Sequence, residues 1–223
     1  MTNYYITDSN LSTNLASLKT VIEPISTEYF DKITLSGDNL TLDFYTGEHK
    51  LLSISVIDNN YLKVDLYGDN CSVTQYPGGH MSTKYKTYIR LVTKTKTGIA
   101  LAINCNGWGA PHGLFITKTN KITVGVALYT AMCQVMGNNS PQYVYCVNKK
   151  SINADPVFMI NGVKDNIISQ PLTTAYPLVV SGTEDYTPNL FAVPTCPYKG
   201  VNSVLTIKGV NYLYNGYTAL KDE

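Results

Sequence analysis

The sequence is short of charge and of long apolar runs, and each shortage excludes a class of protein. Charged residues are 15% of the chain, and the formal net charge is +1. Because no basic stripe or acidic tail appears, the charge pattern does not favour nucleic acid as a partner. No apolar run approaches the roughly 20 residues of a membrane-spanning helix, so we expect no membrane insertion. The first residues lack a basic segment followed by an apolar core, so we predict no secretory signal and folding in a cytoplasm.

Paired cysteines are also missing. The chain has five cysteines, none of them in Cys-x-x-Cys spacing: Cys71, Cys105, Cys133, Cys146 and Cys196. This distribution excludes zinc ribbons and thioredoxin-like redox motifs. Since cysteine is often simply a core residue, we predict buried free thiols, with no disulfide and no structural metal.

Histidine is scarce as well, with only His49, His80 and His112. His80 and His112 lie in glycine-rich segments, where they could meet Cys105 or Cys71 in a metal site or in a cysteine–histidine hydrolase pair. No pair has a recurring zinc spacing, and the local signatures of cysteine proteases are missing around every cysteine. We therefore predict no metal ligand, no cofactor and no catalytic histidine.

The sequence marks no catalytic pair of acids. A glycosidase needs two positioned carboxylates. The acids available for that role lie in predicted turns or on polar strand faces: Asp43, Glu48, Asp58, Asp65 and Asp69. Acids in such places usually meet water. We therefore predict a protein that is not an enzyme.

Tyrosine is what the chain has in abundance, with 18 Tyr against 5 Phe and 1 Trp. A tyrosine side chain has an apolar body and a polar tip, which suits half-wet surfaces and subunit interfaces. Several tyrosines alternate with apolar residues, as in the segments 143–145 and 212–214. This pattern predicts a β-rich protein with large contact surfaces.

The single tryptophan, Trp108, lies in a glycine-rich segment that we expect to be a loop, residues 106–113. The segment is not a P-loop, because it lacks the Gly-Lys-Ser/Thr ending. A loop tryptophan can stack on a sugar or anchor a partner, and it can equally fold back to fill the core. Trp108 and the nearby His112 are candidate ligand or partner contacts.

One amphipathic helix is predicted near the start, over residues 10–23. Its apolar stripe recurs at helical spacing: Leu11, Leu15, Leu18 and Ile22. Asp8 and Ser9 are plausible N-caps, and Pro24 ends the helix. A thin stripe on a short helix must be buried, either on its own domain, which is the default, or on a neighbouring subunit as an assembly contact.

From Tyr29 onward the pattern is β. Apolar residues alternate with polar ones, and turn residues interrupt them at 36–39, 46–48, 58–60 and 68–70. The apolar set of the first hairpin is Ile33, Leu35, Leu40, Leu42 and Phe44. Further hairpins are predicted over 85–104 and 114–132. The prediction is a mainly β fold, an antiparallel sandwich or a barrel-like domain, with residues 1–24 as an N-terminal helix or arm and 25–223 as a single β-rich domain.

The last residues predict a terminal hairpin, with strands near 203–208 and 210–214 and a turn at Asn215-Gly216 that returns residues 217–221 along the sheet. The alternation places Leu205 and Ile207 on the face toward the core. Tyr212 and Tyr214 share one face, which we expect to be at least half buried against the domain or a neighbour. These two tyrosines are further candidate contacts.

This part of the chain also carries a resemblance. Residues 185–194 (DYTPNLFAVP) and 205–223 (LTIKGVNYLYNGYTALKDE) resemble a loosely defined family of uncharacterised tail-associated proteins of phages and prophages of Gram-positive bacteria. In such proteins the chain often ends in a Gly-Val-x-Tyr, Asn-Gly, Leu/Ile-Lys-Asp hairpin. The resemblance implies a structural role in the virion, in the tail, the baseplate or an attached fibre. It supplies no catalytic residues.

Three hypotheses about function follow. The first is a structural component of a tailed-phage virion, made in the host cytoplasm, whose partners are other virion proteins and copies of itself. The second is a host-surface or carbohydrate-binding module at the tail tip, with Trp108 as a platform and a bacterial cell-surface glycan as ligand. The third, least supported by the residues, is a cell-wall hydrolase.

Overall fold

The structure is a computed structural model that describes most of the N-terminal half of the chain and parts of the rest. The described ranges are 2–5, 11–58, 61–67, 72–76, 87–105, 112–117, 125–130, 143–148, 156–158, 163–164, 174–179, 186–192, 203–207, 209–214 and 218–222. Between residues 125 and 192 the description covers the backbone alone.

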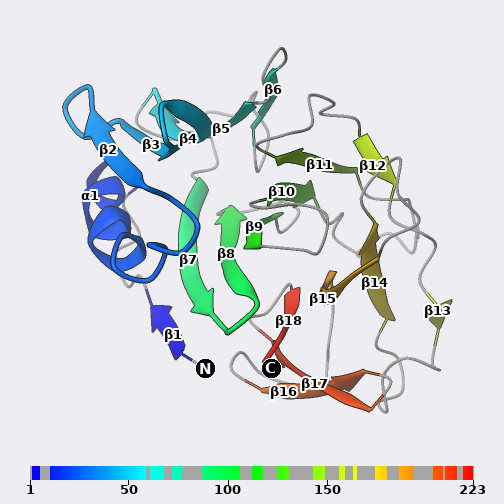
Figure 1. Cartoon of the computed structure of the whole chain (residues 1–223). Coiled ribbons are helices and arrows are strands. Elements are labelled where there is room, and N and C mark those ends of the chain that lie inside the picture. Colours follow the sequence, from blue (N-terminus) through cyan, green and yellow to red (C-terminus); the bar gives the residue numbers. More distant parts are fainter. Residues whose placement is uncertain are drawn as a thin grey trace.

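Three antiparallel sheets and one helix make up the described chain (Figure 1). The five-stranded sheet is a meander in chain order: β2 (Lys32–Ser36), β3 (Thr41–Thr46), β4 (His49–Ile57), β5 (Tyr61–Tyr67) and β6 (Ser72–Gln75). The seven-stranded sheet has the order β1 (Thr2–Tyr5), β7 (Thr87–Lys94), β8 (Gly98–Cys105), β9 (His112–Thr117), β10 (Gly125–Thr130), β11 (Tyr143–Asn148) and β12 (Pro156–Phe158). The six-stranded sheet has the order β13 (Val163–Lys164), β14 (Thr174–Val179), β15 (Tyr186–Ala192), β18 (Thr218–Lys221), β17 (Val210–Tyr214) and β16 (Val204–Ile207).

These sheets confirm the prediction of a mainly β, antiparallel fold with one short helix. The finer choice between a sandwich and a barrel stays a prediction. The predicted turns of the first meander are confirmed by backbone conformation, since Gly37, Asp38, Asn39 and Gly47 all have positive φ. Leu40, one of the alternating apolar residues of the predicted first hairpin, lies in the turn before β3 and is 37% exposed.

The helix α1 (Leu11–Ile22) confirms the predicted helix to within a residue at each end. Leu15, Leu18 and Ile22 are fully buried, and the helix packs against β7, β2 and β3. Lys19 pairs with Glu23 at 2.6 Å across one turn near its C-terminal end. The stripe therefore docks on its own chain, and these three side chains are not exposed for an assembly contact. The side chain of Leu11 lies outside the described residues.

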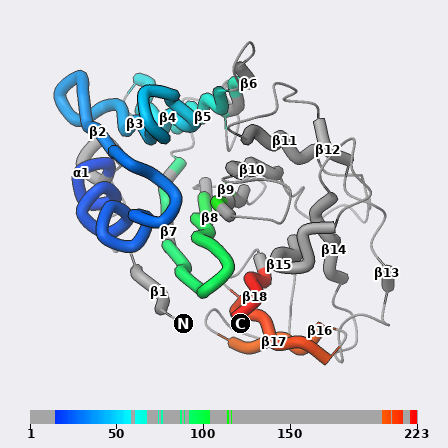
Figure 2. The backbone as a smooth tube through the Cα atoms, in the orientation of Figure 1, coloured from blue at the N-terminus to red at the C-terminus, as the bar shows by residue number. Residues whose placement is uncertain are grey.

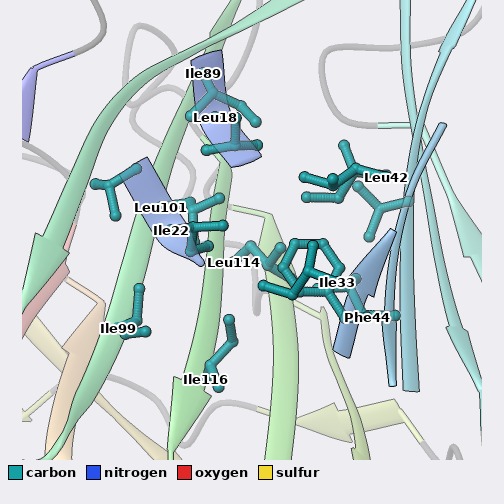
Figure 3. Packing of buried hydrophobic residues seen from close by; sticks show 14 of the residues in the cluster. Leu18, Ile22, Ile33, Leu42, Phe44, Ile89, Ile99, Leu101, Leu114 and Ile116 are labelled. Atoms are coloured by element: carbon teal, nitrogen blue, oxygen red, sulfur yellow. The ribbon is translucent and has the colours of Figure 1, made fainter. Parts of the chain in front are cut away.

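One large core joins the helix to two of the sheets. Figure 3 shows Ile33, Leu42 and Phe44 of the five-stranded sheet on one side and the apolar side chains of β7, β8 and β9 on the other. Within the five-stranded sheet the inward rows follow the register, since Leu42 is opposite Ile54 and Phe44 is opposite Leu52. Because residues two apart share a face, one side of this sheet is apolar and the other polar.

The middle of the chain differs from the sequence prediction in detail. The sequence predicts a loop at His112, but this residue is the first of β9, where its backbone lies opposite Ile103 and Thr130. The strand β1 was not predicted at all, and it pairs with β7. It is a four-residue strand without apolar alternation, so its formation depends on pairing with a partner far along the chain.

The strands of the predicted C-terminal hairpin are confirmed, whereas the predicted turn at Asn215-Gly216 lies outside the described residues. The hairpin strands β16 and β17 lie at the lower rim of the molecule in the tube view, in orange, and β18, in red, runs inward from them (Figure 2). Leu205 and Ile207 are each 1% exposed, and they face a small apolar cluster with Ala219. The turn before β17 contains Gly209 with φ of 80°, a conformation that glycine adopts without strain.

Candidate functional site

The predicted contact residues separate into buried and undescribed ones. Trp108 lies outside the described residues, and so does the side chain of His112. Tyr212 and Tyr214 are each 4% exposed, packed in the cluster of the C-terminal hairpin. Burial raises the pKa of Tyr212. These two rings are thus part of the interior of the chain, as the prediction of a half-buried face allowed.

The most organised polar feature is the outward face of the five-stranded sheet. Strand register brings Asp43 opposite Ser53, and Ser53 opposite Asp65, so that three polar residues form a row across β3, β4 and β5. Thr34 and Thr74 extend this row onto the flanking strands. The sequence could not reveal the row, because its two acids are far apart in the chain and only strand register aligns them.

The acids of this row are buried and paired. Asp43 is 8% exposed and Asp65 is 5% exposed. Ser53 donates a hydrogen bond to Asp43, and the hydroxyl of Thr74 donates to Asp65. A lysine completes each site, with Lys50 Nζ 3.5 Å from Asp43 Oδ1 and Lys63 Nζ 2.7 Å from Asp65 Oδ2.

The neighbouring carboxylates raise the pKa of both lysines. Burial lowers the pKa of Lys50, but the charge of Asp43 and the neighbouring Tyr67 and Tyr45 outweigh it, so the pKa is raised above 10.5. The hydrogen bond to Asp65 raises the pKa of Lys63, against a smaller opposing effect of burial. Both lysines are therefore held as cations.

A second row lies beside the first, nearer one end of the strands. Lys32 is opposite Tyr45, and Tyr45 is opposite Lys50. The ammonium of Lys32 lies 5.5 Å from the ring centre of Tyr45, and that of Lys50 lies 4.9 Å from the ring centre of Tyr67. We call these four residues the lysine–tyrosine row. It alternates cations with aromatic rings, within cation–π distance.

This face can stabilise the sheet and present hydrogen-bond donors beside aromatic rings. Asp43 and Asp65 are two strands apart, roughly 10 Å from strand spacing alone. Each is hydrogen-bonded and ion-paired, which is typical of buried structural carboxylates. Of the other candidate acids, Glu48 and Asp58 are exposed in turns, and Asp69 lies outside the described residues.

The metal candidates do not come together in what the structure describes. Within the described ranges no group of three or more His, Cys, Asp or Glu side chains could hold a metal ion. His49 begins β4, whereas His80 lies outside the description along with Cys71, Cys133 and Cys196. Only the backbone is described at the remaining two cysteines. In the same part of the chain, no helix is long and apolar enough to span a membrane.

Exposed apolar side chains are few among the described residues. The large ones are Leu40, 37% exposed in a turn, and Val204, 42% exposed on β16. Val204 is the more unusual, because β16 is the last strand of the six-stranded sheet. The second side of this strand pairs with no other described strand. Sequence alternation identified the strand, but its edge position depends on the non-local order of β15, β18, β17 and β16.

Comparison of the chain with protein-family models, with curated proteins and with solved structures found no match.

Proposed function

We propose that this chain is a non-enzymatic structural component of a tailed-phage virion, in the tail, the baseplate or an attached fibre, and that it acts through protein–protein contacts. The observation that carries the proposal is the C-terminal hairpin. The second of the two segments that resemble tail-associated phage proteins begins at Leu205 within β16. This strand ends a sheet, and its first residue, Val204, is exposed. Exposed edge strands readily pair with strands of other chains.

The polar face of the five-stranded sheet supports the same proposal. Each of its two buried acids accepts a hydrogen bond from a hydroxyl and forms an ion pair with a lysine, so these contacts stabilise the sheet. An antiparallel framework whose buried carboxylates are paired suits a protein that acts by holding a shape.

Deletion of the gene from the phage or prophage tests the proposal. We expect lysates in which electron microscopy shows particles without a complete tail or tail appendage, with infectivity restored by supplying the intact chain. Unchanged particle morphology and unchanged infectivity would contradict the proposal.

A second candidate is a carbohydrate-binding module for a bacterial cell-surface glycan. The lysine–tyrosine row favours it, because rings can stack on sugars and ammonium groups can donate to hydroxyls. A cell-wall pull-down with Tyr45→Ala and Tyr67→Ala, beside Trp108→Ala, tests this candidate. Lost binding with unchanged thermal melting would support it, and unchanged binding by all three variants would eliminate these residues as the platform.

A further inference from the structure

Within the described part of the chain, the edge strand β16 shows none of the usual protection of edge strands. Native sheets guard exposed edges with charged residues, proline, bulges or a covering element. The sequence of β16 is Val204-Leu-Thr-Ile207, with no charge and no proline, and its pairing with β17 has no bulge. On its solvent side Val204 is 42% exposed and Thr206 is also exposed.

The hydrogen bonds of the hairpin define which backbone groups face outward. The N–H of Tyr214 donates to the carbonyl of Ser203 at 2.9 Å. In an antiparallel pair, hydrogen-bonded positions alternate with positions whose N–H and C=O point away from the partner strand. With Val204 opposite Leu213 and Thr206 opposite Asn211, the residues whose backbone groups point away from β17 are Val204 and Thr206.

We propose that β16 pairs antiparallel with β16 of a second copy of this chain, about a two-fold axis at Leu205. This inference names the partner of the structural contact proposed above and rests on that function. The axis places Val204 opposite Thr206 of the second copy and Thr206 opposite Val204 of the second copy. All four outward groups of each strand then find partners, so the six-stranded sheet continues into a second one.

Self-complementarity is the reason that the partner is a second copy. Two outward-facing residues symmetric about Leu205 form an edge that matches its own two-fold image, as an isologous contact requires. The strand β16 carries no charged residue, so no like charges oppose each other across the two-fold pairing.

The contact is small. Four residues of edge bury much less than the roughly 1,200 Å² of a standard interface, so the isolated pair is weak and transient. A symmetric assembly offsets this weakness, because neighbouring copies held together raise the effective concentration of the edges. The expected behaviour of the free protein is therefore concentration-dependent association.

Proline substitutions test the outward-facing and the β17-facing N–H groups of β16 separately. Thr206→Pro removes an N–H that points outward, so the bonds to β17 remain, and proline is tolerated on edge strands in this position. The matched control is Thr206→Val, which keeps the N–H and removes the same hydroxyl. Leu205→Pro removes an N–H that points to β17, and it should disrupt the hairpin itself. Val204→Lys is a second test that leaves the backbone unchanged.

The measurement is amide hydrogen exchange by NMR with light scattering, on the full chain from dilute samples to about 1 mM. We expect the amides of Val204 and Thr206 to exchange at least about tenfold more slowly in concentrated samples, with growth in mass. Thr206→Val should behave likewise, whereas Thr206→Pro and Val204→Lys should stay monomeric and melt as the wild type does.

A monomeric wild type, or equal association of Thr206→Pro, would overturn the pairing. A chain that pairs in solution but is missing from particles would refute only the virion role.

Discussion

At the scale of single residues, the polar face of the five-stranded sheet buries short polar side chains beside longer lysine and tyrosine side chains. Asp43, Ser53 and Asp65 are almost fully buried on this face. A buried carboxylate is tolerated only when hydrogen bonds and an opposite charge replace its lost hydration. Asp43 and Asp65 each have both kinds of partner, a hydroxyl donor and a lysine.

Asp65→Ala should lower the free energy of unfolding by about 1–3 kcal/mol, because the hydroxyl of Thr74 and the ammonium of Lys63 lose their acceptor. Urea denaturation measures the change. The control Glu48→Ala removes an acid that is exposed in a turn, and it should be nearly neutral. Equal costs for the two variants would contradict the structural role of the buried Asp65 carboxylate.

Gly209 allows the turn before β17 to form without backbone strain. At φ of 80°, with open space where a Cβ would lie, Gly209→Ala meets only the backbone penalty, about 1–2 kcal/mol. Gly209→Asn should cost less, since asparagine visits this region more readily. Thermal melting of the two variants decides the matter, and an alanine variant as stable as the wild type would show that the turn adopts another conformation.

At the scale of elements, the periodicity of apolar residues predicted the elements that have a local sequence pattern. The helix and the first meander follow from apolar spacings of 3.6 and 2 residues, and the turns follow from glycine, aspartate and asparagine. Leu40 continues the apolar alternation of the first hairpin, although it lies in the turn beside β3 and not in the strand. The strand β1 has no local signature of its own.

Strand register and strand order could not be predicted from the sequence. The row of Asp43, Ser53 and Asp65 depends on how three strands align, and a shift of one residue would turn it inward. The edge position of β16 depends on β18 inserting between β15 and β17, a non-local choice. Burial of Tyr212 and Tyr214 was predictable from alternation, but their packing within the chain was one of two outcomes left open.

The helix stripe gives a test at this scale. Leu18→Asp should lower stability by about 3–5 kcal/mol, because a carboxylate without a partner would enter the shared core. The adjacent Ser17→Asp is the control, since Ser17 is exposed on the same helix and should be nearly neutral. Circular dichroism melts compare them, and a stable, folded Leu18→Asp protein would mean that the stripe is not in the core.

At the scale of the whole molecule, separate sheets are tied together by side chains. The ammonium of Lys94 on β7 donates to the carbonyl of Ile25 at 2.9 Å and pairs with Glu28. The hydroxyl of Thr97, beside β8, donates to the carbonyl of Lys221 at 2.9 Å. The helix region, the seven-stranded sheet and the C-terminal hairpin are therefore linked, and they should unfold together.

Alkaline pH should weaken this molecule. Burial, followed by the charge of Glu28, raises the pKa of Tyr29, and burial raises that of Tyr212. The unfolded tyrosines ionise near pH 10.0, while the folded ones keep their protons, so stability is full below that pH and falls above it. The raised pKa values of Lys50 and Lys63 act in the same direction above pH 10.5.

Urea unfolding at pH 8 and pH 11, with tyrosinate absorbance, measures this dependence. Tyr212→Phe should flatten the loss of stability at high pH, because one raised tyrosine pKa is removed. Equal stability at both pH values in the wild type would contradict the burial of these rings.

The proposed role is tested most directly by the composition of purified particles. Quantitative mass spectrometry should find this chain in virions, in a fixed small ratio to a major tail protein that matches the copy number of a symmetric assembly. Particles carrying the deletion of residues 203–223 should lack the chain, since the hairpin supplies the proposed contact. The account is contradicted if intact, infectious virions contain none of it.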